Sequence, residues 1–207
     1  EVGQSVAAQR DLEALLTRAT HLISDRFNYY HAGIFLLDPQ NEYAVLRASN
    51  SSGGAKMLER GHRLRVGTEG IVGTVASTGE ARIALDVGED AVFFDNPDLP
   101  QTRSEMALPL IAGGETLGIL DIQSIEADAF SEEDIPILQV LADQLATAVQ
   151  NANLLRNSQE ALMLARKATR DISQQGWKSF LQEDAELGYV SSMDGEVTPV
   201  SEILNTD

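Results

Sequence analysis

Hydrophobic residues recur with a helical spacing near both ends of the 207-residue chain. In the first part they lie three or four positions apart and form one apolar stripe: Val6, Leu12, Leu15, Leu16, Ala19, Leu22, Ile23 and Phe27. This pattern predicts an amphipathic entry helix over residues 1–27. A second helix is predicted over residues 131–174, because Ser131 is a suitable N-cap, acidic residues follow it, and nothing interrupts the pattern before Gly176.

The second helix also has the spacing of a coiled coil. Its apolar residues alternate at steps of three and four, namely Leu138, Leu141, Leu145, Ala148, Ala152, Leu155 and Leu162. Up to about Val149, packing on the protein's own domain is the simpler interpretation. For residues 152–172 we expect a parallel homodimer through the terminal helices, with Ala152, Leu155, Leu162, Ala165 and Ile172 as seam candidates.

Between the two helices the period shortens to two or to brief apolar runs, which is typical of strands. The predicted strands are 31–37, 42–49, 62–66, 81–85, 104–111 and 116–124, with a short helix over 70–77. Residues 51–54, Ser-Ser-Gly-Gly, are expected to open a loop, and the unpatterned stretch 86–103 is a long loop of the kind that often carries function. Two short turns, 38–41 and 112–115, predict hairpins and an α+β fold with antiparallel strands.

The last 33 residues change character again. Asp194-Gly195 between β-forming residues predicts a hairpin, preceded by a helical turn around Trp177. So short a segment cannot build a stable core alone, so we interpret 175–207 as a linker towards a following domain.

Charge and cysteine content exclude several classes of function. A formal net charge of −17 without a basic cluster argues against nucleic-acid binding and against direct membrane contact. The chain has no cysteine, so disulfides, thiolate metal sites and thiol catalysis are excluded for these residues. It begins at Glu1 without a signal-peptide pattern, and we expect a segment of a longer protein located in the cytoplasm, alone or as the cytoplasmic part of a membrane-bound sensor.

Five segments together resemble the GAF domain over roughly residues 10–152. They are AGIFLLDP (32–39), GIVGTVASTGE (70–80), RSEMALPL (103–110), LGILDIQS (117–124) and FSEED (130–134). The resemblance implies a six-stranded antiparallel sheet with the N- and C-terminal helices on one face and a ligand pocket on the other, under the 86–103 loop. It also implies a domain core over 28–152 and a long C-terminal signalling helix.

The same resemblance suggests which residues line that pocket. The candidates are Phe35, Ile71, Val72, Asp86, Phe93, Phe94, Arg103, Ser104, Met106 and Leu108. Core packing is the simpler interpretation for Phe93, Phe94 and Met106. Asp86 and Arg103 are the stronger candidates, since a charge in a cavity needs a partner or a ligand, although an exposed loop charge is the simpler alternative for each.

Ligand classes known in the family can be compared with this sequence. A covalently attached bilin and the thiol chemistry of the family's methionine-sulfoxide reductases both require cysteine. Phe130 and Asp134 match the cyclic-nucleotide motif, but Gln123-Ser124 and Ile135 depart from it. The three histidines, His21, His31 and His62, show no ligand spacing, which argues against haem. No metal cluster or catalytic constellation stands out.

The sequence therefore predicts a non-catalytic sensory module of a bacterial signalling protein, such as a sensor histidine kinase of a two-component system. It would sense a small molecule or a partner and pass the change through a dimeric helix to an output domain of the same chain. Two alternatives remain open: a ligand-free dimerisation and spacing module, and a binding domain for haem or a cyclic nucleotide.

Overall fold

A computed structural model describes residues 2–87, 96–183, 189–191 and 197–199, with side chains for 10–87 and 96–175. The elements, in chain order, are α1 (Val2–Phe27), β1 (His31–Leu37), β2 (Tyr43–Ser49), α2 (Ser52–Glu59), β3 (Arg63–Arg65), α3 (Gly70–Thr78), β4 (Arg82–Ala84), β5 (Ser104–Ala112), β6 (Glu115–Ser124), α4 (Asp134–Glu183), β7 (Tyr189–Ser191) and β8 (Val197–Pro199). The chain divides into two units, Glu1–Arg156 and Asn157–Asp207.

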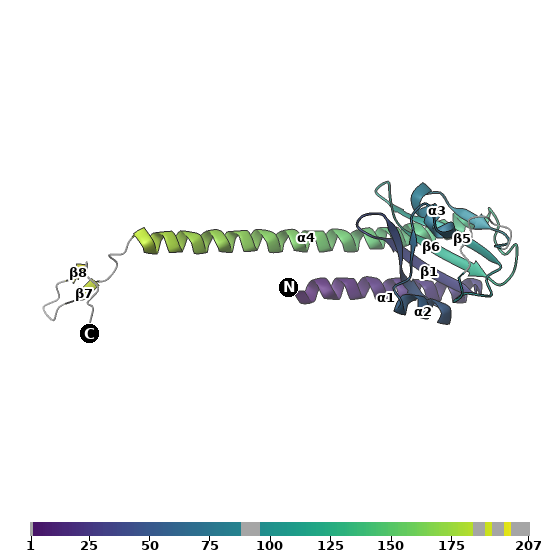
Figure 1. Ribbon diagram of the computed structural model, residues 1–207, viewed down its shortest axis with the longest axis horizontal. Coiled ribbons are helices and arrows are strands. Elements are labelled where there is room, and N and C mark those ends of the chain that lie inside the picture. Colours follow the sequence, from purple (N-terminus) through teal and green to yellow (C-terminus); the bar gives the residue numbers. More distant parts are fainter. Residues whose placement is uncertain (1, 88–95, 184–188, 192–196, 200–207) are drawn as a thin grey trace. The chain divides into compact units, whose positions relative to one another are not determined.

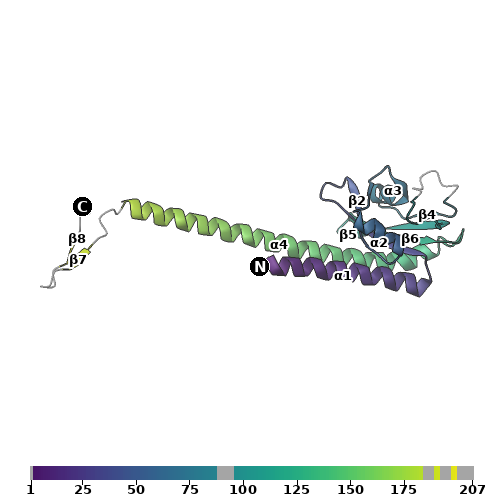
Figure 2. The same cartoon turned by 60° about the horizontal axis from the view of Figure 1, so that its bottom comes forward.

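The first unit is built on a six-stranded antiparallel sheet with the strand order β3-β2-β1-β6-β5-β4. Its α+β architecture is the one that the sequence predicted. Figures 1 and 2 show α1 and the first part of α4 side by side along one face of the sheet, and α3 over the other. Both faces of the central strands are therefore covered.

The two faces carry separate apolar cores. On the helix face, residues of α1 and α4 such as Leu16, Leu138 and Ala146 pack against a layer of strand residues, which are Ala32, Ile34, Ala48, Met106, Leu108, Leu110, Leu120 and Ile122. On the opposite face, Met57 of α2 and residues of α3 pack against Phe35, Ala107 and Ile119. Successive residues of β6 alternate between the two cores, as the pleat of a strand requires.

Residues 51–54 are not the loop that the sequence suggested. Helix α2 begins at Ser52, and Ser51 is its N-cap, with Oγ accepting a hydrogen bond from the Gly54 N–H at 3.0 Å. The two glycines serve close packing: a Cβ on Gly53 would lie 2.0 Å from the Asp98 backbone oxygen, and one on Gly54 would lie 1.7 Å from Ser49 Oγ. Here glycine brings a helix against its neighbours, rather than breaking it.

The C-terminal helix also differs from the prediction. It ends at Glu183 and continues through Gly176, where we expected a stop. One glycine inside a helix costs only about 1 kcal/mol relative to alanine, which neighbouring helical residues can offset. Beyond it, β7 and β8 pair as an antiparallel two-stranded sheet, in agreement with the predicted hairpin. No helix of the described residues is both long and apolar enough to cross a membrane.

The tight fit of α2 gives a stability prediction. We expect Gly54→Ala to lower the free energy of unfolding by roughly 1–3 kcal/mol, because the added methyl group must displace Ser49. Ser52→Ala, on the exposed side of the same helix turn, is the matched control and should change it by less than about 0.5 kcal/mol. Urea denaturation of both variants measures the difference, and equal stabilities would contradict the packing described for Gly54.

Candidate functional site

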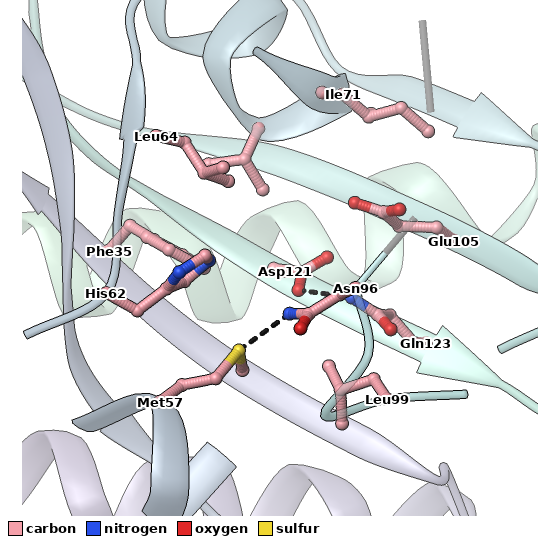
Figure 3. Close-up of a pocket in the computed structure, with 12 residues that line it drawn as sticks. Phe35, Met57, His62, Leu64, Ile71, Asn96, Leu99, Glu105, Asp121 and Gln123 are labelled. Carbon is pink, nitrogen blue, oxygen red and sulfur yellow. Dashed lines mark hydrogen bonds between the residues drawn. The ribbon is translucent and has the colours of Figure 1, made fainter. Parts of the chain in front are cut away.

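A small pocket lies on the sheet face opposite α1 and α4. Its volume is about 20 Å³, enough for one group of the size of a water molecule. The lining residues are Phe35, Met57, His62, Leu64, Gly70, Ile71, Val72, Asn96, Leu99, Glu105, Asp121 and Gln123. Figure 3 shows that apolar side chains form much of the wall, while Asp121, Glu105, Gln123 and Asn96 supply polar atoms. The polar groups come mainly from the sheet.

Strand register explains why these polar groups meet. Glu105 of β5 pairs with Gln123 of β6, and Gln123 pairs with His31 of β1, so the three side chains form one row across the sheet. The next row holds Ala107, Asp121 and Gly33. Asp121 thus has a methyl group on one side and no side chain on the other, which leaves space around its carboxyl group.

Hydrogen bonds tie this floor to the segment that precedes β5. Gln123 Nε2 donates to Asp121 Oδ2 at 2.8 Å, and Thr102 Oγ1 donates to Gln123 Oε1 at 2.6 Å. Further along, Asn96 Nδ2 donates to the Met57 sulfur at 2.7 Å. Residues 96–102 are therefore held both to the sheet and to α2.

His31 is completely buried beside the pocket floor. Its Nδ1 lies 2.7 Å from Ser51 Oγ, which also accepts a hydrogen bond from the Gly54 N–H. Its Nε2 makes no hydrogen bond and lies 3.8 Å from Asp121 Oδ2. His31 faces Asp121 without bonding to it.

Burial shifts the pKa of both groups. It raises the pKa of Asp121 to about 6, although hydrogen bonding with Glu105 and Gln123 acts in the opposite direction. It lowers the pKa of His31 to about 4, and nearby His62 contributes to the same shift. At neutral pH His31 is uncharged, so it supplies no counter-charge for Asp121.

Three of the predicted pocket residues, Phe35, Ile71 and Val72, line this pocket. Met106 and Leu108 do not, because alternation along β5 turns them into the core beneath α1 and α4. Ser104 points to the same side of β5 as Met106 and Leu108, and it donates its hydroxyl hydrogen to the Glu126 backbone oxygen at 2.7 Å.

The charged candidates lie elsewhere. Asp86 and Arg103 form an ion pair of 2.9 Å, in which Arg103 is exposed and Asp86 is partly buried, and neither residue lines the pocket wall. The pair satisfies both charges at the surface, which was the simpler alternative for each residue. Phe93 and Phe94 lie outside the described residues.

Sequence reasoning missed Glu105, Asp121, Gln123 and His31. The signal was present: in LGILDIQS the acidic and amide residues alternate with apolar ones, and Glu105 likewise interrupts an apolar strand. Polar residues at alternate positions of a strand whose other face is core must point to the second face. With that face also covered, such residues are buried and need partners.

Asp121 predicts a specific pH dependence of stability. Its pKa in the folded chain, about 6, exceeds the value of about 3.9 for a free carboxyl group, so its contribution to stability is complete only below about pH 3.9 and is progressively lost as the pH rises through 6. Asp121→Asn removes this contribution. The free energy of unfolding of the variant minus that of the parent chain should therefore be larger at pH 7.5 than at pH 4.5.

Urea unfolding at the two pH values measures this difference. Asp25→Asn, at an exposed position of α1, is the control and should show a smaller change. His31, whose pKa is lowered by burial, changes the stability with pH in the opposite direction. It is present in the parent chain and in both variants, so its effect largely cancels from the comparison. A stability difference for Asp121→Asn that does not depend on pH would contradict the burial argument.

The described residues contain no group of three or more His, Asp or Glu side chains that could hold a metal ion. The pocket presents two buried carboxyl groups, the amides of Gln123 and Asn96, the imidazole of His62 and an apolar wall. It can accept hydrogen bonds from a donor or a cation.

Comparison with known proteins identifies the family. A family model described as "GAF domain" matches residues 9–150. The chain is 27% identical over 121 residues to GAF domain-containing protein A of Dictyostelium discoideum, a match that covers 58% of this chain and 70% of the relative. It is 35% identical over 77 residues to the free methionine-R-sulfoxide reductase of Saccharomyces cerevisiae, covering 36% of this chain and 41% of that enzyme.

A solved structure agrees with this fold. The GAF domain of a phosphoenolpyruvate-protein phosphotransferase from Coxiella burnetii superposes with a TM-score of 0.61 at 24% identity, over 74% of this chain and 94% of that chain. Its likeness shows the fold alone. With more than half of its residues matched by the family model, the chain belongs to the GAF domain family.

Proposed function

We propose that this chain is a non-catalytic sensory module that binds a small molecule in the pocket above β5 and β6 and transmits the change through α4. The alternation of residues on β6 is the observation that carries this proposal. Asp121 and Gln123 face the pocket, whereas Leu120 and Ile122, their immediate neighbours, belong to the core beneath α1 and α4. A shift of β6 would therefore change the pocket and the packing beneath α1 and α4 at the same time.

Close packing on the helix face supports the transmission. Leu120, Ile122, Leu138 and Ala142 are 0–1% exposed and belong to one core cluster, so a displaced strand has no free volume into which it can relax. Packed cores respond to such a shift by moving a neighbouring element. The element packed here is α4, which continues to Glu183.

The alternative of a ligand-free spacing module rests on the size of the cavity. At about 20 Å³ the pocket is mostly filled by side chains, and it is far too small for haem or a cyclic nucleotide as it stands. The unpaired carboxyl oxygen of Asp121 favours an occupant, since a filled structural core would leave no such group. We therefore place ligand sensing ahead of a purely structural role.

A reductase role is the other candidate, because a free methionine-R-sulfoxide reductase is among the relatives. These 207 residues contain no cysteine, which supports a regulatory role over thiol chemistry. We place the module in the cytoplasm, as part of a bacterial two-component or related signalling protein with an output domain.

Thermal unfolding against cyclic nucleotides, nucleobases, amino acids, keto acids and haem tests the sensory role. A compound at 100 times its dissociation constant should stabilise the folded chain by roughly 2.7 kcal/mol. Leu64→Trp, which fills the pocket from the β3 side, should abolish the shift, whereas Leu154→Trp, at an exposed position of α4, should not. The absence of a shift with every compound would favour the spacing module.

We also propose a parallel homodimer through the second half of α4. Leu155, Leu162 and Ile172 are 49%, 52% and 70% exposed, and Ala165 is exposed as well, so four of the five seam candidates are available to a partner. Ala152 packs against the core of its own domain and is a weaker candidate. Exposed apolar residues at heptad spacing are stabilised by pairing with a second helix.

A chain without cysteine permits a direct test of this pairing. A single Leu155→Cys or Leu162→Cys substitution should form an intermolecular disulfide under mild oxidation, because equivalent seam positions face each other in a parallel pair. Glu160→Cys, on the opposite side of the helix, should cross-link at least about tenfold more slowly. Equal rates at all three positions, or a monomeric mass by light scattering, would contradict the dimer.

A further inference from the structure

The pocket holds two carboxyl groups from neighbouring strands. Glu105 and Asp121 are only 5% and 2% exposed, and both line the same small cavity (Figure 3). Asp121 Oδ2 accepts a hydrogen bond from Gln123, but Asp121 Oδ1 makes no hydrogen bond. A buried carboxyl oxygen without a partner is costly, so this atom needs a donor.

The described part of the protein does not supply that donor as a cation. No lysine or arginine is among the described residues of the pocket wall. His62 lines the pocket wall, but burial lowers its pKa. His31 Nε2 lies 3.8 Å from Asp121 Oδ2, which is too long for a hydrogen bond. The imidazole is held in place by Ser51 on its other side and by Gly33 beneath it, where even a Cβ would lie 2.9 Å from Nε2.

Cavity size and wall chemistry restrict what can enter. A volume of about 20 Å³ fits a group as large as a water molecule, and an ammonium group has that size. It also donates three hydrogen bonds, which matches a floor that holds two carboxyl groups. Around the floor stand the apolar side chains of Phe35, Leu64, Ile71 and Leu99, and an aliphatic substituent on the amine must displace some of them, because the cavity itself holds only the ammonium group.

We infer that the pocket recognises a small molecule through a primary ammonium group, which the paired carboxylates of Asp121 and Glu105 bind together. This inference rests on the proposed sensory role of the pocket and adds the chemical class of its ligand. The apolar wall selects amines that carry a short hydrocarbon group. Gln123, fixed by Thr102, orients Asp121 and acts as a positioning residue.

Without a ligand, the hydrogen bond between the carboxyl groups of Asp121 and Glu105 requires a proton on one of them. An ammonium group takes the place of that proton, so binding releases it to solvent. The affinity for an amine should accordingly fall by up to about tenfold per pH unit as the pH drops below 6. An apolar ligand without an amine would show no such dependence.

Calorimetric titration of the full 207-residue chain tests the assignment with matched probes. Isobutylamine and leucine carry an ammonium group, and isobutanol and 4-methylpentanoate are the corresponding molecules without it. We expect heat and an increased melting temperature with the first two only, together with proton release, seen as a dependence of the heat on the ionisation enthalpy of the buffer.

Two conservative variants and one control locate the site. Asp121→Asn and Glu105→Gln keep the shape of the side chains and should each weaken amine binding at least tenfold. Asp86→Asn, which changes a carboxylate of the surface ion pair, should leave binding unchanged. Circular dichroism confirms that each variant is folded before titration.

The outcomes separate the ligand class from the sensory role. Equal binding of the probes with and without an amine, or retained binding by both carboxyl variants, would overturn the ammonium assignment. If amines fail but another compound of the broader panel raises the melting temperature and Leu64→Trp abolishes that effect, the sensory role stands and the assignment is wrong. Failure of both experiments would reject the two together.

Discussion

Burial of the central sheet on both faces is the constraint on which the rest of this structure depends. An antiparallel sheet can leave one face in water, but here α1 and α4 cover one side, and α2, α3 and residues 96–102 cover the other. Every residue of β1, β5 and β6 near the centre must then be apolar or have a polar partner. Glu105 and Asp121 are buried but not apolar, and one carboxyl oxygen of Asp121 makes no hydrogen bond.

This constraint also connects the pocket to the signalling helix. The pocket and the helix-facing core are separated by the thickness of one strand, and consecutive residues of β6 belong to one or the other. No long pathway through the molecule is required. In the proposed sensory role, the change that passes across the sheet is a displacement of β6, whose backbone is hydrogen-bonded on both edges to β1 and β5.

Much of the fold could be predicted from the sequence because the strong periodic patterns coincide with burial. Strand β1 and the antiparallel sheet follow from apolar runs and turn residues, and helix α3 ends at Gly79, whose φ of 69° favours glycine, as the pattern indicated. The loop prediction at residues 51–54 was wrong because Gly53 and Gly54 serve tertiary packing. They allow α2 to contact Asp98 and Ser49, and no local sequence pattern encodes such contacts. The pocket was predicted on the correct face, but Met106 and Leu108 were assigned to it although alternation turns them away. The burial of Glu105 and Asp121 could not be predicted with certainty, because it depends on which segments cover the second face.

Hydrogen exchange of the chain with and without saturating isobutylamine tests the central claim, that occupation of the pocket changes α4 through the sheet. The account predicts altered protection of amides in β5, in β6 and in the part of α4 that packs on them, residues 134–149, with no effect in Asp121→Asn. Altered exchange confined to the pocket side, with α4 unchanged while the amine is bound, would contradict it.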